Sequence, residues 1–95
     1  MPQLRATIYG RVQKVSFRAY AQDEARHLGL TGWVCNRPDG SVETLAVGSS
    51  DALQRYLRWL QRGSPASHVV HVESNITDEP DQIAESYTTF DITGL

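Results

Sequence analysis

The spacing of apolar residues switches along this chain between the period of a strand and the period of a helix, and the order of the switches restricts the fold most. Leu4, Ala6 and Ile8 alternate with polar residues, which predicts a strand with one buried face. From Phe17 to Leu28 the apolar residues recur at three or four positions, which predicts a helix ended by Gly29. The chain therefore begins with a strand, a loop and a helix.

Two further strands and a second helix follow. The segments Trp33–Cys35 and Ser41–Val47 are predicted to form a hairpin around the sequence Arg-Pro-Asp-Gly at 37–40. In that turn the proline presets one dihedral angle and the glycine accepts a positive φ. The second helix begins near Ser50, with an apolar stripe made by Leu53, Tyr56, Leu57 and Leu60.

The last part of the chain is expected to hold two strands separated by a loop. Val69, Val70 and Val72 indicate a fourth strand, and Phe90 and Ile92 a short final one. The acidic, polar stretch from Asn75 to Glu85 is interpreted as an exposed loop. The order β-α-β-β-α-β plus a terminal strand predicts an α+β, ferredoxin-like sandwich: an antiparallel sheet with two helices on one face. At 95 residues, the chain is expected to be a single domain, 1–95.

Composition restricts the expected compartment, membrane association and oligomeric state of the protein. The single cysteine, Cys35, cannot form an internal disulfide, so the fold depends on its core and suits a reducing compartment. The first residues lack the basic stretch and apolar run typical of a signal peptide, and no apolar run approaches the roughly 20 residues that a membrane span needs. We therefore expect a cytoplasmic protein that does not bind membranes, and a monomer, since no second long apolar face is evident.

Charge is distributed unevenly over a chain whose net charge is −2. Residues 1–37 carry six basic and two acidic side chains, and residues 38–95 carry three basic and nine acidic ones. Two interpretations are open. The asymmetry arises by chance, or the basic N-terminal third faces a small anion. The overall acidity argues against nucleic acid, since phosphate neutralisation supplies most of that affinity. Single-stranded RNA binding by this type of fold also needs exposed aromatic residues on central strands, and Ser41–Val47 has none.

The segment from Gly10 to Arg18 connects the first strand to the first helix and is a candidate anion site. A helix N-terminus presents unpaired N–H groups and the positive end of a dipole. Arg18, in the first helical turn, can add a bidentate charged contact. Ser16 is predicted to cap the helix through its hydroxyl, which is a better explanation for it than a nucleophile without a nearby base. The alternative is a plain connecting loop with a solvated arginine.

This loop also resembles the signature of the acylphosphatase family, in the pattern Gly10-Arg11-Val12-Gln13-x-Val15-x-Phe17-Arg18. A second match begins with Leu28-Gly29-Leu30-x-Gly32-Trp33-Val34-x-Asn36 and continues with x-x-Asp39-Gly40-x-Val42-Glu43. Gly48 falls where the family has a glycine after its third strand. The two motifs lie in register over roughly residues 6 to 48, and the second half fits by length and element placement.

The resemblance implies roles for individual residues. Arg18 matches the arginine that binds the phosphate group, and Asn36 matches the asparagine that positions the attacking water. The loop residues Gln13, Lys14, Val15, Ser16 and Phe17 match the amides that surround the phosphate. The implied reaction is hydrolysis of a small-molecule acyl phosphate to a carboxylate and inorganic phosphate, with the latter as product and inhibitor. Neither a metal, another cofactor nor a phosphoenzyme is implied.

One position departs from the family pattern. Lys14 stands where the family usually has glycine, and a lysine at positive φ costs on the order of 1–2 kcal/mol. An altered loop leaves open a second function, a non-catalytic module that binds phosphate or carbamoyl phosphate. Cys35 is expected on the strand face opposite Asn36, as a packed residue, and Arg37 either at the rim of the pocket or in solvent.

Overall fold

The computed structural model describes residues 1–78 and 87–94, and its elements follow the predicted order. Where the spacing of apolar residues changes, the structure changes between strand and helix. The elements are β1 (Pro2–Arg11), α1 (Phe17–His27), β2 (Thr31–Asn36), β3 (Val42–Val47), α2 (Ser50–Arg62), β4 (His68–Asp78) and β5 (Phe90–Thr93). Gly29 ends α1 with a φ of 75°, as predicted.

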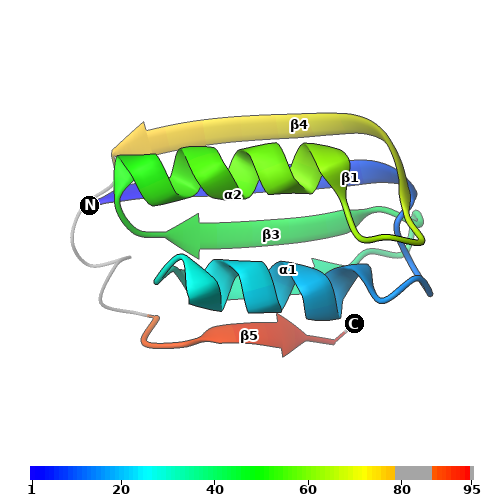
Figure 1. Cartoon of the computed structure of the whole chain (residues 1–95), viewed down its shortest axis with the longest axis horizontal. Coiled ribbons are helices and arrows are strands. Elements are labelled where there is room, and N and C mark those ends of the chain that lie inside the picture. Colours follow the sequence, from blue (N-terminus) through cyan, green and yellow to red (C-terminus); the bar gives the residue numbers. More distant parts are fainter. Residues whose placement is uncertain (79–86, 95) are drawn as a thin grey trace.

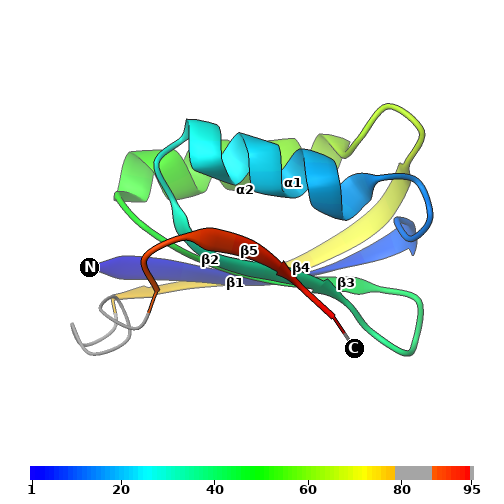
Figure 2. The ribbon, with the colours of Figure 1, turned by 90° about the horizontal axis from the view of Figure 1, so that it is seen from below.

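The five strands form one sheet in the order β4-β1-β3-β2-β5, with both helices on the same face (Figures 1 and 2). The predicted β2–β3 hairpin is confirmed, with Asn36 opposite Val42 in its register. Strands β1 to β4 pair antiparallel, as predicted, and the terminal strand β5, whose direction the sequence pattern left open, pairs parallel to β2 at one edge. The reason is visible in Figure 1: β5 begins at the end of the sheet where β4 finishes, so it runs in the direction of β2.

Strand β4 is longer than the apolar pattern indicated. The predicted loop from Asn75 to Glu85 is wrong for 75–78, which pair with the start of β1 as far as Asp78 opposite Pro2. Ile76 lies opposite Leu4 and packs against the core. Pairing with a long neighbouring strand therefore overrides the polar composition of this segment. The rest of the predicted loop, residues 79–85, lies outside the described residues.

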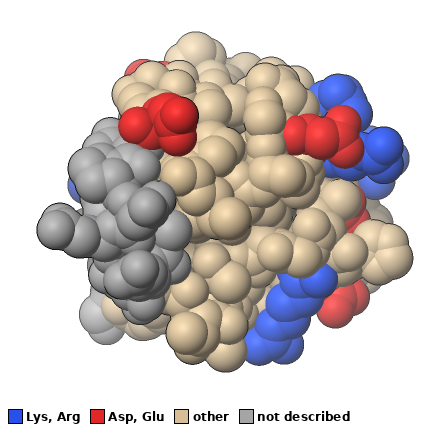
Figure 3. All heavy atoms as spheres, turned by 90° about the vertical axis from the view of Figure 1, so that its left-hand side faces the viewer, with Lys and Arg blue, Asp and Glu red and all other residues tan. Residues whose placement is uncertain are grey.

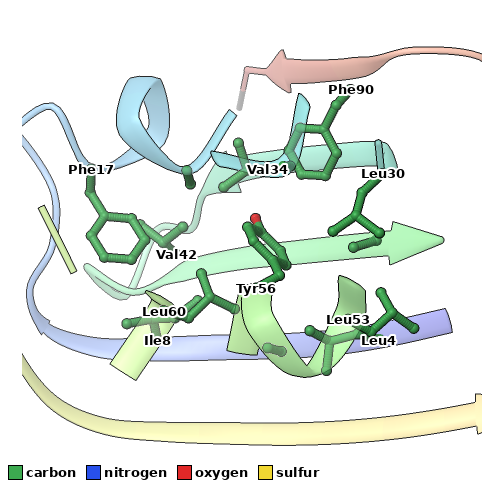
Figure 4. Packing of buried hydrophobic residues seen from close by; sticks show 14 of the residues in the cluster. Leu4, Ile8, Phe17, Leu30, Val34, Val42, Leu53, Tyr56, Leu60 and Phe90 are labelled. Carbon is green, nitrogen blue, oxygen red and sulfur yellow. The ribbon is translucent and has the colours of Figure 1, made fainter. Parts of the chain in front are cut away.

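The core fills the space between the sheet and the two helices (Figure 4). Leu4, Ala6 and Ile8 are at most 1% exposed, so the predicted inward face of β1 is confirmed. Tyr56 and Phe90 meet edge to face, with ring centroids 5.8 Å apart. In the part of the chain that the structure describes, neither helix has the length and apolar character of a membrane span.

One polar pair lies inside this core. The Thr44 hydroxyl donates a hydrogen bond to the Trp33 carbonyl (2.9 Å) and lies 3.0 Å from the Tyr56 hydroxyl. Since the Thr44 proton is used, the Tyr56 hydroxyl is the donor between them. Burial raises the pKa of Tyr56 above its ordinary value, so the phenol stays protonated at neutral pH.

We expect Thr44→Val to destabilise the protein more than Tyr56→Phe. The tyrosine substitution removes one hydrogen bond and leaves Thr44 paired with Trp33, at a cost of about 1 kcal/mol. The threonine substitution leaves the buried Tyr56 hydroxyl without its partner, at a cost of about 1–3 kcal/mol. Urea unfolding of both variants measures the difference. Equal losses, or a larger loss for Tyr56→Phe, would contradict this account of the pair.

Candidate active site

A cavity of about 350 Å³ opens where α1 begins. The last residues of β2 and β5 lie at the same end of the molecule (Figures 1 and 2). Because both strands are parallel, their carboxyl ends meet beside the N-terminus of the helix. The cavity is lined by Val12, Lys14, Ser16, Phe17, Arg18, Ala19, Asn36 and Ile92.

The loop between β1 and α1 has an unusual backbone. Lys14 and Ser16 adopt left-handed conformations, with φ angles of 63° and 59°. The backbone N–H groups of Lys14, Val15 and Ser16 donate no hydrogen bond to another described residue. Those of Phe17 and Arg18 belong to the first helical turn, where no intrahelical acceptor exists. Alternating loop conformations of this kind gather N–H groups into a concave anion site.

Ser16 does not cap α1 in the predicted way. It occupies the N-cap position, but its hydroxyl makes no capping hydrogen bond. The left-handed backbone (φ 59°, ψ 24°) differs from the extended conformation from which a serine side chain reaches back to the helix. The hydroxyl therefore stays exposed at the cavity.

Positive charge dominates the lining of the cavity. Arg18 is half-buried and Lys14 exposed, and none of the eight lining residues is acidic. Neither cation forms an ion pair with a described residue, so both are available to an anion. Figure 3 views the opposite end of the molecule, where the Lys and Arg side chains on the right of the view lie beside Asp and Glu.

Asn36, the last residue of β2, faces the cavity from the sheet. It lies two residues after the buried Val34 and so shares the face that the helices cover, whereas Cys35 lies on the other face, as predicted. The Asn36 side-chain oxygen is buried and accepts no hydrogen bond from the described residues. An acceptor in this state costs free energy unless a donor reaches it, so it is suited to a ligand or water in the cavity.

Two of the predicted site residues, Gln13 and Val15, do not line the cavity. The Gln13 side-chain nitrogen donates hydrogen bonds to the carbonyls of Arg37 (2.8 Å) and Ser41 (2.9 Å) in the β2–β3 turn. The Val15 side chain packs against the core, and its carbonyl accepts a hydrogen bond from the Ser64 hydroxyl at 3.1 Å. Their side chains fix the loop rather than line the cavity. The other predicted residues, Lys14, Ser16, Phe17, Arg18 and Asn36, line it.

Arg37 lies outside the cavity lining. Its guanidinium pairs with the Glu43 carboxylate, and this hydrogen bond raises the pKa of Arg37 further above its already high value. In the same turn, hydrogen bonds from the Ser41 side chain and backbone lower the pKa of Asp39. Both interactions stabilise the turn that receives Gln13.

Sequence reasoning missed three lining residues: Val12, Ala19 and Ile92. Ile92 is the least expected, because it comes from the far end of the chain. Its alternation with the buried Phe90 was the available signal, since it places both side chains on the helix-covered face. Within 1–78 and 87–94, no group of three or more His, Cys, Asp or Glu side chains is arranged to hold a metal ion.

The chain is similar in sequence and fold to known acylphosphatases. A family model, Acylphosphatase, matches residues 4–92. An acylphosphatase of Chromohalobacter salexigens is 49% identical over 77 residues, which cover 81% of this chain and 86% of that protein. One from Syntrophobacter fumaroxidans is 42% identical and covers 95% of both chains. The crystal structure of acylphosphatase from Bacillus subtilis superposes with a TM-score of 0.89 at 40% identity, over 98% of this chain and 99% of that one.

The hydrogen bonds of Gln13 lead to a prediction about stability. Gln13→Met keeps the length of the side chain but removes both bonds to the turn, and we expect a loss of about 1–2 kcal/mol in the free energy of unfolding. Gln54→Met, at an exposed position of α2, is the matched control and should stay within about 0.5 kcal/mol of the parent. Urea unfolding measures both. Equal stabilities of the two variants would show that the Gln13 bonds do not hold the loop.

Proposed function

Because this chain belongs to the acylphosphatase family, we propose that the cavity at the start of α1 is where it binds and hydrolyses acyl phosphates. The chain is a hydrolase of the carboxyl–phosphate bond, and its products are a carboxylate and inorganic phosphate. The observation that carries the assignment of the site is the meeting of unpaired loop N–H groups, Arg18 and the unpartnered Asn36 oxygen at one cavity.

The phosphate end of the substrate is held by the loop. Backbone N–H groups from Lys14 to Arg18 point their partial positive charge at the phosphate oxygens, and the N-terminus of α1 adds its dipole. The Arg18 guanidinium forms a bidentate contact with two of these oxygens. These groups are already in place before the reaction, so they stabilise charge that develops on the phosphate without reorganising. Inorganic phosphate presents the same oxygens and is expected to inhibit.

The attacking water is held by Asn36. Its side-chain oxygen accepts a hydrogen bond from the water, which leaves a lone pair of the water oxygen free to attack phosphorus. The new bond joins the water oxygen to phosphorus, and the bond from phosphorus to the acyl oxygen breaks. The electron pair leaves with the carboxylate, and a phosphate oxygen takes the proton of the water. An amide cannot act as a base, but an activated anhydride with a carboxylate leaving group needs none.

A non-catalytic module that binds phosphate or carbamoyl phosphate is the alternative that Lys14 suggests. No comparison favours it, and the unpartnered Asn36 oxygen has a use in hydrolysis that phosphate binding alone does not require. Catalysis therefore accounts for the cavity better than binding alone.

We expect Arg18→Ala and Asn36→Ala each to lower hydrolysis of benzoyl phosphate by at least about 100-fold, or roughly 2.7 kcal/mol of barrier. Steady-state kinetics in EDTA measures this and tests metal dependence at the same time. Arg26→Ala, at an exposed arginine on the same helix, is the control and should match the parent. Arg18→Ala should also weaken inhibition by inorganic phosphate, whereas Asn36→Ala should lower kcat and leave that inhibition unchanged.

The result for the parent protein decides between the two functions. Turnover in EDTA, lost in both variants, would support the assigned site. A parent that binds inorganic phosphate through Arg18 but turns over no acyl phosphate would overturn catalysis in favour of the binding module.

Lys14 adopts the left-handed conformation that glycine accepts freely, so Lys14→Gly should stabilise the protein. Relief of about 1–2 kcal/mol of strain is offset by about 0.5–1 kcal/mol of extra chain entropy, which leaves a net gain of about 0.5–1 kcal/mol. Hydrolysis should be equal to or faster than that of the parent, because the backbone that holds the phosphate is kept. Lys14→Ala removes the same charge but keeps the strain, so it should not stabilise. A large loss of activity in both variants would show instead that the ammonium group contributes.

A further inference from the structure

The lining of the cavity combines polar and apolar side chains. Lys14, Ser16, Arg18 and Asn36 supply the charged and hydrogen-bonding groups, and the other lining residues carry only apolar side chains. Val12 and Phe17 are each 1% exposed and belong to the core beneath the cavity. The apolar side chains that reach its mouth are therefore Ala19 on α1 and Ile92 on β5.

Ile92 is held at this position by the sheet. It lies opposite Val34 in the parallel pairing of β5 with β2, two residues short of the level of Asn36. It shares the face of Phe90, which is 1% exposed and packs in the core, whereas Ile92 itself is 39% exposed. A large aliphatic side chain with this exposure, on the inward face of its strand, is not explained by core packing.

The chemistry of hydrolysis places the acyl group at the mouth. The buried Asn36 oxygen, which the proposed function assigns to the water, lies at the inner side of the cavity. Attacking and leaving oxygens lie roughly in line through phosphorus in such a displacement. The leaving carboxylate therefore points away from Asn36 and outward, and the substituent on its carbonyl carbon meets the exposed side chains there.

We propose that Ile92, together with Ala19, forms a subsite for the acyl group and gives this protein a preference for apolar acyl phosphates, aryl or alkyl, over small polar ones such as carbamoyl phosphate. This inference rests on the proposed function of the cavity. It assigns Ile92 to specificity, whereas the phosphate loop and Asn36 serve every acyl phosphate alike.

The test compares the kcat/KM values for benzoyl phosphate and carbamoyl phosphate in the parent and in Ile92→Ser. We expect the ratio of the two to fall by about tenfold, mainly through the KM for benzoyl phosphate. A tenfold change is at the low end of the discrimination, about 10- to 200-fold, that one methylene gives in a closed hydrophobic pocket. We expect the low end because Ile92 is partly exposed. Ile92→Leu keeps an apolar side chain and should keep the ratio. Val70→Ser, at a 71% exposed aliphatic on β4, is the matched control and should also keep it.

Each outcome has a separate meaning. A selective fall of the ratio in Ile92→Ser, in a protein that urea unfolding shows to be folded at the assay temperature, supports the subsite. An equal loss on both substrates, or no change in an active parent, would overturn it and leave the proposed function intact. A parent inactive on both substrates would overturn the proposed function and the subsite with it.

Discussion

Strand β1 is the element on which the rest of the structure depends, because it is paired on both sides and also delivers the loop. It pairs with β3 over Gln3–Ile8 and with β4 along its whole length. The register with β4 shifts between Tyr9 and Gly10, where the chain begins to leave the sheet. Gly10 has a φ of 129°, and a Cβ there would lie 2.2 Å from the His68 carbonyl oxygen. Only glycine allows β4 to approach this closely at the shift that directs the chain toward α1.

The strained loop that follows is held from several sides. Gln13 bonds to the β2–β3 turn, and the Ser64 hydroxyl, after α2, bonds to the Val15 carbonyl. Val12 and Phe17 anchor the two ends of the loop in the core. Left-handed residues such as Lys14 and Ser16 persist only where surrounding contacts determine them, and here those contacts come from the β2–β3 turn, the segment after α2 and the core. The same contacts hold in place the loop whose N–H groups are unpaired.

A fold this small can serve such a reaction because little covalent chemistry falls to the protein. An acyl phosphate is already activated, so the catalyst has to orient a water molecule and stabilise charge on phosphate oxygens. In the function proposed for this cavity, backbone dipoles, one guanidinium and one amide supply both. Each of these groups comes from the junction of β1, α1 and β2, so the site needs no second domain.

The sequence by itself determined the order of the elements, the inward face of β1, the β2–β3 turn and five of the residues that line the cavity. Those features depend on neighbours in the chain, through apolar period, turn chemistry and a contiguous motif. Only the tertiary structure decided that β4 continues through 75–78, that β5 runs parallel to β2, and that Ile92 reaches the cavity. It also decided that Ser16 is left-handed and does not cap α1 through its hydroxyl, and that Gln13 binds the turn rather than lining the cavity. These features depend on pairing and contacts between segments far apart in the chain, and local propensity does not encode such contacts.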